Sequence, residues 1–299
     1  MAVLQEWLSS AGINYISDAP MKDYTSFKIG GKADILIKPA SRDEIAAVVS
    51  KCAEIGMKYI IVGKGSNLLV SDSGIGYAVI LIADNYSGVK LHPDNIIECR
   101  AGTSLAAVCA FARDHSLSGM EFAWGIPGTA GGAACMNAGA YGGEMKNVVV
   151  KCSHVDEAGN IGEFTEGDLD FIYRGSVYSG LNYCVTKVYI KLIPSQKDAI
   201  QAKMDDYMQR RRSKQPLDYP SAGSVFKRPE GNYAAALIEQ CGLKGYTVGG
   251  AAVSSKHSGF IINTGGALSA DVQKLIEHIK AVVKEKTGYE LECEVKVVL

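Results

Sequence analysis

The sequence lacks the features that mark secreted, membrane-spanning and zinc-binding proteins. Its eight cysteines form no C-x-x-C pair, and several lie in apolar stretches, which fits reduced, buried thiols better than a zinc site or a disulfide framework. No apolar run reaches the ~18 residues of a membrane span, and no basic segment precedes an apolar one at the N-terminus. We therefore expect a cytoplasmic protein that needs no metal and has no targeting or membrane segment.

The chain also lacks an excess of either charge. Its 299 residues include 31 Lys and Arg against 32 Asp and Glu, a formal net charge of −1. No field of one sign is available to hold nucleic acid or an anionic membrane non-specifically. The basic run Arg210–Arg212 with Lys214 is isolated, and we interpret it as a solvated helix end, with contact to a substrate diphosphate as the alternative. We expect small-molecule ligands, no nucleic acid or membrane partner, and a monomer or weak oligomer.

Two familiar nucleotide-binding motifs are incomplete. Gly63–Gly65 begins like the dinucleotide fingerprint G-x-G-x-x-G, but Leu68 holds the third glycine position and an extended apolar stretch follows instead of a helix. At Gly30–Lys32, the lysine is followed by alanine, and Ser26 stands where a P-loop has its first glycine. The sequence therefore predicts neither a Rossmann unit nor a Walker A loop.

Two glycine-rich segments are present instead. Seven glycines fall between Gly125 and Gly143, and a shorter turn, Gly63–Asn67, follows an apolar run. Glycine lets successive backbone N–H groups turn toward an anion and approach it closely, because no Cβ blocks the contact. Two such cradles suit a diphosphate. That the glycines merely mark turns is an open alternative for the shorter segment and a weak one for the longer.

The first third of the chain predicts alternating strands and helices. We expect strands at Ala33–Lys38 and Tyr59–Val62. Between them, Ser41 and Glu44 form a capping-box pattern that starts a helix. A strand, a helix and a strand in this order would deliver the Gly63–Asn67 turn at the carboxyl end of the second strand, where ligands bind in α/β sheets.

The remainder predicts a β-rich middle and a separate C-terminal part. Several β-rich runs alternate with turns between Val148 and Ile193. Pro194 begins a helical stretch that ends in the basic run, and Pro216 then breaks the chain, as in a linker between domains. The last part should hold a helix near Asp271–Lys286 with an apolar inward face, and a closing strand over Leu291–Leu299.

Seven segments together resemble one known family. They occur in the order seen in the UDP-N-acetylenolpyruvoylglucosamine reductases and span nearly the whole chain: Thr25–Asp34, Gly63–Asn67, Gly125–Gly132, Asn137–Ala140, Tyr173–Ser176, Ala222–Lys227 and Leu291–Val295. Any one of these motifs is weak, whereas seven in register are specific. The chain thus resembles a family of bacterial cell-wall flavoenzymes.

The resemblance implies an α+β architecture: a two-subdomain FAD-binding unit of the vanillyl-alcohol-oxidase type, followed by a smaller α/β substrate-binding domain. We expect residues 1–85 and 86–205 to form the two FAD-binding subdomains. Residues 206–299 would form the substrate-binding domain, with the last strand returning toward the FAD unit. Longer members carry an insertion with a lid tyrosine after the Tyr-Arg-Gly-Ser motif. Here the chain runs directly from Ser176 to Asn182, so it resembles the shorter class.

The resemblance also implies the reaction. Hydride passes from NADPH to a non-covalently bound FAD and then to the enolpyruvyl double bond of UDP-N-acetylglucosamine enolpyruvate, giving UDP-N-acetylmuramate for peptidoglycan synthesis. No metal is required. The residues expected to hold FAD are Gly63, Lys64, Gly65, Ser66, Asn67, Gly125, Ile126, Pro127, Gly128, Thr129, Gly131, Gly132, Asn137 and Gly139.

Three residues match the family's catalytic positions. Hydride addition builds negative charge on the neighbouring carbon and carboxylate, so a cation or acid must stabilise it and a donor must protonate the carbon. Arg174 and Glu294 match the stabilisers, and Ser224 matches the donor. Each has a plainer alternative: a surface cation, the solvent face of an alternating strand, and a turn hydroxyl. Lys227 or Arg228 would supply the field that stabilises the alkoxide left on the serine.

Four residues match the family's substrate side: Tyr173, Lys227, Arg228 and His257. The match of His257 is loose, and a structural histidine is the alternative. Two other functions stay open. A related flavin oxidase of the same cofactor fold would use oxygen and often a covalent flavin, and a non-catalytic flavin or nucleotide sensor would bind without turnover.

Overall fold

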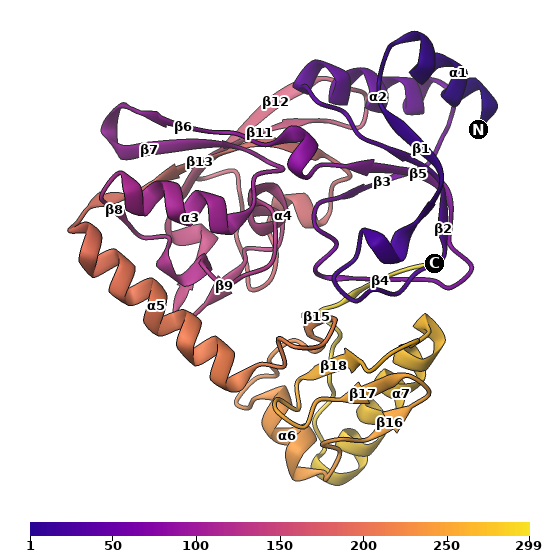
Figure 1. Ribbon diagram of the computed structural model, residues 1–299, viewed down its shortest axis with the longest axis vertical. Coiled ribbons are helices and arrows are strands. Elements are labelled where there is room, and N and C mark those ends of the chain that lie inside the picture. Colours follow the sequence, from indigo (N-terminus) through magenta and orange to yellow (C-terminus); the bar gives the residue numbers. More distant parts are fainter. The chain divides into compact units, whose positions relative to one another are not determined.

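The computed structural model describes residues 1–299, which divide into two compact units. Unit 1 comprises Met1–Ser17, Ile35–Lys64 and Tyr77–Arg210, and unit 2 comprises Asp18–Asp34, Gly65–Gly76 and Arg211–Leu299. Figure 1 colours the chain by sequence, from indigo at the N-terminus to yellow at the C-terminus. Two segments of the N-terminal third therefore belong, by their contacts, to the unit that the C-terminal third builds.

The first sheet confirms the predicted strand, helix and strand. Its order is β1-β2-β5-β3, and its strands are β1 (Tyr15–Pro20), β2 (Lys32–Ile37), β3 (Tyr59–Val62) and β5 (Ile75–Leu81). Helix α1 (Ala2–Ser10) precedes β1, and helix α2 (Arg42–Glu54) joins β2 to β3. Ser41 Oγ accepts the Glu44 N–H at 3.1 Å, so the predicted N-cap is confirmed.

The second sheet lies wholly in unit 1 and has five antiparallel strands in the order β12-β11-β13-β7-β6. The strands are β6 (Val89–His92), β7 (Ile96–Arg100), β11 (Val149–Val155), β12 (Ile161–Thr165) and β13 (Cys184–Lys191). Helix α3 (Leu105–Asp114) follows β7, and helix α4 (Ala130–Cys135) packs against β7 and β13 (Figure 1). The β-rich middle of the chain is thereby confirmed.

Short elements connect these parts. Paired strands β8 (Leu117–Ser118) and β14 (Ile193–Pro194) and hairpin strands β9 (Gly139–Ala140) and β10 (Gly143–Glu144) are each two residues long. Single turns of 3-10 helix occur at Met21–Asp23, Asp84–Tyr86, Pro93–Asn95, Glu121–Ala123, Met145–Asn147 and Val177–Ser179. Helix α5 spans Lys197–Lys214. It starts three residues later than predicted, because Pro194 pairs in β14 instead.

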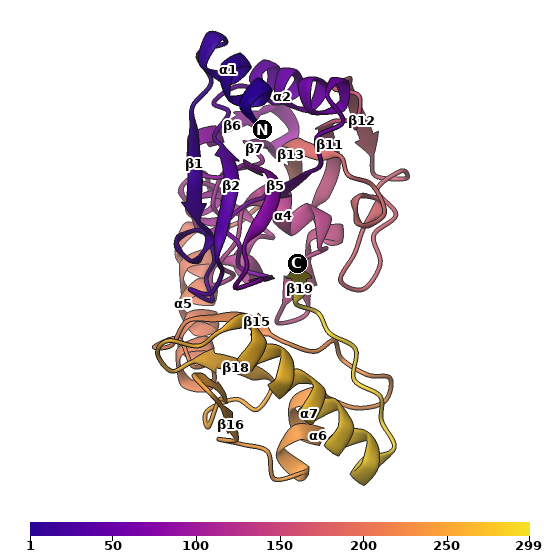
Figure 2. The ribbon, with the colours of Figure 1, turned by 90° about the vertical axis from the view of Figure 1, so that its right-hand side faces the viewer.

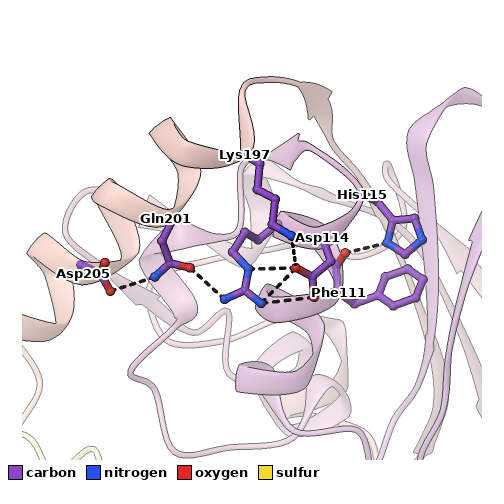
Figure 3. A network of polar contacts seen from close by, with 7 residues as sticks. Phe111, Asp114, His115, Lys197, Gln201 and Asp205 are labelled. Carbon is purple, nitrogen blue, oxygen red and sulfur yellow. Dashed lines mark hydrogen bonds and ion pairs between the residues drawn. The ribbon is translucent and has the colours of Figure 1, made fainter.

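A polar network fastens the start of α5 to the end of α3 (Figure 3). Arg113 Nη1 donates to Gln201 Oε1 at 2.8 Å, and Lys197 Nζ lies 2.8 Å from Asp114 Oδ1. Gln201 Nε2 continues the network to Asp205 at 2.8 Å. Helix α5 buries few side chains. These polar contacts therefore hold one face of α5 against the end of α3.

Unit 2 contains a four-stranded antiparallel sheet covered by two helices. The strands β15 (Ser221–Ser224), β16 (Thr247–Val248), β17 (Ala251–Val253) and β18 (Phe260–Asn263) lie in the order β15-β18-β17-β16. Helices α6 (Ala234–Gln240) and α7 (Ser269–Thr287) pack together on one side of the sheet (Figure 2). The predicted inward face of α7 is confirmed, since its buried residues include Val272, Leu275, Ile276, Ile279 and Val283.

The N-terminal segments of unit 2 are built into its core. Phe27 is fully buried there, and Asn263 Nδ2 donates to the Phe27 carbonyl at 3.1 Å. The Asp72 carboxylate accepts the Ser269 N–H at 2.8 Å and the next N–H at 3.1 Å, so it caps α7 from a distant part of the chain. Strand β4 (Leu68–Val70) pairs in parallel with β19 (Lys296–Val298), which is shorter than the predicted closing strand.

Most of the cysteine side chains are buried, as their apolar surroundings in the sequence predict. Six of the eight cysteines are buried and none forms a disulfide. No group of three or more His, Cys, Asp or Glu side chains is placed to hold a metal ion. None of the helices combines the length and the apolar character that crossing a membrane would require.

Candidate functional site

The two glycine-rich segments meet within unit 1. Gly63 follows β3, and Thr129 caps α4, with its Oγ1 accepting the Gly132 N–H at 3.3 Å. A Cβ added to Gly63 would lie 2.6 Å from Thr129 Oγ1, closer than such atoms pack. A side chain at position 63 would therefore displace Thr129, and the two predicted cradles lie against each other.

The loop before α3 fixes the backbone of the longer segment. The Leu105 N–H donates to the Gly128 carbonyl at 3.0 Å, and the Gly131 N–H donates to the Ala101 carbonyl at 2.9 Å. A Cβ on Gly131 would lie 2.7 Å from Ala101 Cβ. Gly131 thus allows close packing, and its own N–H is engaged. The residues from 125 to 128 are half-buried or exposed, which leaves part of this loop open to a ligand.

The shorter turn continues into unit 2 at Gly65. Gly65 has a φ of +58°, and a Cβ there would collide with the Tyr24 carbonyl oxygen. The Ser26 N–H donates to the Gly65 carbonyl at 3.3 Å. The Thr25–Asp34 motif, to which the sequence analysis gave no role, therefore includes residues that support this turn.

Asn137 has a structural position in unit 1. It is buried, its Nδ2 donates to Glu144 Oε2 and to the Ile172 carbonyl, both at 2.9 Å, and its Oδ1 accepts the Lys146 N–H at 3.0 Å. Both Nδ2 protons are thus engaged by the protein. Asn137 ties the β9–β10 hairpin, which includes Gly139, to the segment that carries Arg174.

Arg174 is held in a tight turn. The Ile172 and Gly175 backbones exchange hydrogen bonds of 3.0 and 3.2 Å around it, and Arg174 has a φ of +58°. Its Nη1 donates to the Gly139 carbonyl at 3.3 Å, and its guanidinium carbon lies 5.6 Å from the Tyr173 ring centroid. The side chain is half-buried. A left-handed φ costs a non-glycine residue about 1–3 kcal/mol and is found preferentially at functional sites.

Residues that the sequence analysis did not single out anchor this turn from behind. Ser176 Oγ donates to the carbonyl of Cys135, at the end of α4, at 3.0 Å. Tyr178 is buried, with its hydroxyl 3.1 Å from His154 Nδ1, and burial lowers the pKa of His154. Ser176 belongs to a motif and could have been found, whereas no sequence signal distinguishes His154.

Unit 2 brings Asn67, Ser224 and Glu294 together from three distant parts of the chain. Ser224 ends β15, and the carbonyl of the next residue, Val225, accepts the Glu294 N–H at 2.7 Å. Asn67 Nδ2 donates to the Glu294 carbonyl at 3.0 Å. Ser224 and Glu294 are both half-buried. Glu294 lies before the strand, which begins only at Lys296, so the alternation of a strand does not decide which way its side chain faces.

The basic substrate-side residues have partners within unit 2. Lys227 Nζ forms an ion pair with Glu292, and the Lys227 N–H donates to the Glu292 carbonyl at 2.8 Å. The Arg228 guanidinium carbon lies 4.0 Å from the centroid of the Tyr233 ring. Both side chains are thus held near the end of β15, but the charge of Lys227 is partly compensated.

His257 has the contacts of a structural histidine. Its Nδ1 accepts the Gly259 N–H at 3.2 Å, and its ring lies edge-on to Phe260 with 4.9 Å between centroids. Burial lowers the pKa of His257, which favours the neutral ring that can accept this bond. These contacts shape the turn before β18.

Comparison with known families confirms the predicted fold class. Residues 33–165 match the FAD binding domain family, and residues 215–298 match the family described as UDP-N-acetylenolpyruvoylglucosamine reductase, C-terminal domain. The class of protein is therefore a flavoprotein in which a FAD-binding fold precedes a smaller α/β domain.

Individual relatives define the family. The UDP-N-acetylenolpyruvoylglucosamine reductase of Caldanaerobacter subterraneus subsp. tengcongensis is 50% identical over 279 residues, covering 93% of this chain and 92% of that protein. The protein of the same name from Clostridium botulinum (strain 657 / Type Ba4) is 46% identical over 285 residues, or 95% and 92%. The crystal structure of the reductase from Thermus caldophilus superposes with a TM-score of 0.81 at 34% identity, covering 96% and 99%. The chain belongs to the UDP-N-acetylenolpyruvoylglucosamine reductase family.

Proposed function

We propose that the chain reduces UDP-N-acetylglucosamine enolpyruvate to UDP-N-acetylmuramate with NADPH, by way of non-covalently bound FAD, in the synthesis of peptidoglycan precursors. Family membership over nearly the whole chain supports this activity. The hydrogen bonds that join Asn67, Glu294 and Val225, the residue after Ser224, are the structural observation that carries it, because they bring together three motifs that are far apart in the sequence.

The glycine segments fit FAD. A Cβ would fill the space between Gly63 and Thr129, and the Gly65 turn has no room for a side chain. These glycines let the segments pack closely, and the neighbouring residues 64 and 125 to 128 are half-buried or exposed, which leaves backbone N–H groups available to a diphosphate at short range. The Gly63–Asn67 and Gly125–Thr129 segments would hold the cofactor. When bound, FAD would accept a hydride from NADPH and deliver it to the distal carbon of the enolpyruvyl double bond.

Arg174 and Glu294 would stabilise the negative charge that this addition creates on the substrate. The Arg174 guanidinium is oriented in advance by the Gly139 carbonyl, so it needs little reorganisation when charge develops on the carboxylate. Glu294 has its backbone fixed on both sides. In its protonated form it would donate a hydrogen bond to the developing enolate.

Ser224 would complete the reaction by protonating the carbon next to the carboxylate. The O–H bond of the serine breaks as the new C–H bond forms, and water then restores the proton to the alkoxide. Gly223 precedes it within β15 with a φ of +76°, at the point where the pairing register of the strand shifts. Tyr173, Lys227, Arg228 and His257 would contact the UDP-sugar or shape its site.

A coupled assay tests the activity directly. The purified protein should be yellow, release free FAD on denaturation, and oxidise NADPH only when UDP-N-acetylglucosamine enolpyruvate is present. Flavin that stays attached after denaturation, with oxygen consumption, would favour the oxidase alternative. Bound flavin without any turnover would favour the sensor. We further propose that the protein works in the cytoplasm, where thiols such as its eight cysteines stay reduced, and acts as a monomer or weak oligomer.

A further inference from the structure

We propose that Asn67 is a positioning residue. Through its hydrogen bonds to the C-terminal segment, residues 291–299, it makes the order of Glu294 depend on whether a ligand is bound at the Gly63–Asn67 turn. Binding of FAD at the turn would thereby order Glu294, and an ordered C-terminal segment would tighten FAD binding. The inference rests on the proposed function, because it places FAD against the Gly63–Asn67 turn.

The C-terminal segment is fastened at two points within unit 2. Upstream, the Lys227 N–H donates to the Glu292 carbonyl at 2.8 Å and the Glu294 N–H donates to the Val225 carbonyl at 2.7 Å. Downstream, the Lys296 N–H donates to the Asn67 carbonyl at 3.0 Å. Glu294 lies between the two attachments, and its own carbonyl accepts the Asn67 side chain at 3.0 Å.

Asn67 therefore contacts this segment twice, with its side chain and with its backbone. It is the last residue of the cofactor turn and directly precedes β4. Any ligand that fixes the backbone of the turn fixes both of these hydrogen-bonding groups. The Glu294 N–H donates to the carbonyl of Val225, which directly follows Ser224. The hydrogen bonds that begin at Asn67 therefore reach the backbone beside the proposed proton donor.

The downstream attachment is weak enough to respond to a ligand. Upstream, Leu291 and Val295 are 6% and 5% exposed and belong to the apolar core of unit 2. In β19, by contrast, Lys296 and Val297 are exposed, and the strand pairs only with β4 in a two-stranded sheet. Leu69 and Val70 of β4 are fully buried, so β19 is the strand of this pair that lacks buried side chains and opens at low free energy. Its order then depends on the turn that precedes β4.

Proline substitutions separate this coupling from a general loss of stability. In Lys296→Pro the N–H that pairs with Asn67 is removed. Val297→Pro is the matched control. Adjacent residues of a strand face opposite sides, and the backbone groups of Lys296 and Val298 bond on the side of β4. The Val297 N–H therefore points away from β4. Both variants carry the same proline penalty, and neither changes a group proposed to face FAD.

Amide hydrogen exchange of the full-length protein, with and without FAD, measures the coupling. In the wild type, FAD should slow exchange at Glu294 and Lys296 about tenfold, within the ~5–150-fold range of measured couplings. Lys296→Pro should abolish the FAD-dependent protection at Glu294 and weaken FAD binding by a similar factor, because the coupling is reciprocal. Val297→Pro should keep both.

A second readout distinguishes positioning from mere structural support. In Lys296→Pro saturated with FAD, reoxidation of the reduced flavin by the enolpyruvyl substrate should slow about tenfold or more, while its reduction by NADPH stays near normal. Unchanged exchange at Glu294 on FAD binding to the wild type would overturn the inference, as would equal effects of the two proline variants. If the proposed function is wrong, both half-reactions fail in the wild type, while the exchange measurement still decides the coupling.

Discussion

A methyl group added at Gly63 tests whether the two glycine segments form the cofactor cradle. In Gly63→Ala the new Cβ would lie 2.6 Å from Thr129 Oγ1 and 3.3 Å from Thr129 Cγ2. Gly63 does not have a left-handed φ, so alanine adds no backbone strain and the clash is the whole effect. Overpacking of this kind costs ~1–3 kcal/mol. If the segments separate to relieve it, FAD binding should weaken by ~5–150-fold.

Three further variants isolate the clash. Thr129→Ala removes both offending atoms and leaves Thr129 Cβ at 3.5 Å from the new methyl group, at a cost of about 1 kcal/mol for the lost cap of α4. The double variant Gly63→Ala/Thr129→Ala should therefore bind FAD more tightly than Gly63→Ala alone. Gly76→Ala, a position with an ordinary φ and no atom within 4 Å, should bind FAD like the wild type.

Titration of the apoprotein with FAD, followed by flavin fluorescence, gives five dissociation constants: for the wild type, Gly63→Ala, Thr129→Ala, the double variant and Gly76→Ala. Thermal unfolding of the apoprotein shows whether any variant is simply misfolded. If Gly63→Ala binds FAD as the wild type does, the cradle assignment is refuted. If the two substitutions add independently, without rescue, the segments are not in the contact that the structure describes.

The remaining predictions concern catalysis and pH. Arg174→Lys should keep FAD and lose ~10²–10³-fold in kcat/KM for NADPH oxidation, because an ammonium cannot reproduce the forked guanidinium on a carboxylate; near-normal turnover would return Arg174 to a surface role. Ser224→Ala should let NADPH reduce the flavin normally but slow its reoxidation by substrate ~10²–10⁴-fold in stopped flow, and the reverse pattern would place Ser224 on the cofactor side. Burial lowers the pKa of His154 from 6.5, so the unfolded state binds more protons and stability should fall as the pH drops below about 6.5. Denaturant unfolding at pH 7.5 and 5.5 should show a smaller fall in His154→Gln.

Local sequence patterns predicted the elements that local interactions build. The Ser41 cap and the inward face of α7 depend on residues within a few positions of one another, and both were correct. The strand expected over Leu291–Leu299 was too long, because alternation of apolar residues reports burial and not strand pairing. Leu291 and Val295 are buried in the core of unit 2, but only Lys296–Val298 pair with a neighbouring strand.

Contacts between distant segments had no signal in the sequence. Nothing in Asp72 indicates that it caps a helix that begins near residue 269, because a cap is recognisable only when it directly precedes the helix. The burial of Phe27 in the core of unit 2 likewise depends on tertiary structure. The proposed site residues come from the resemblance of seven motifs, since composition and periodicity alone place Arg174 and Glu294 on the surface.

The proposed role of Ser224 does not need the cationic field that the sequence suggested. Lys227 pairs with Glu292, which offsets its charge, and Arg228 lies over the Tyr233 ring. A serine hydroxyl is a poor acid toward water, but its partner here is the carbon of an enolate next to a carboxylate, which is far more basic than an alkoxide. Proton transfer from serine to that carbon is therefore downhill without a lowered serine pKa. The protein has only to place the hydroxyl over the carbon, and the bonds that join Asn67, Glu294 and Val225 hold the strand end from which Ser224 reaches it.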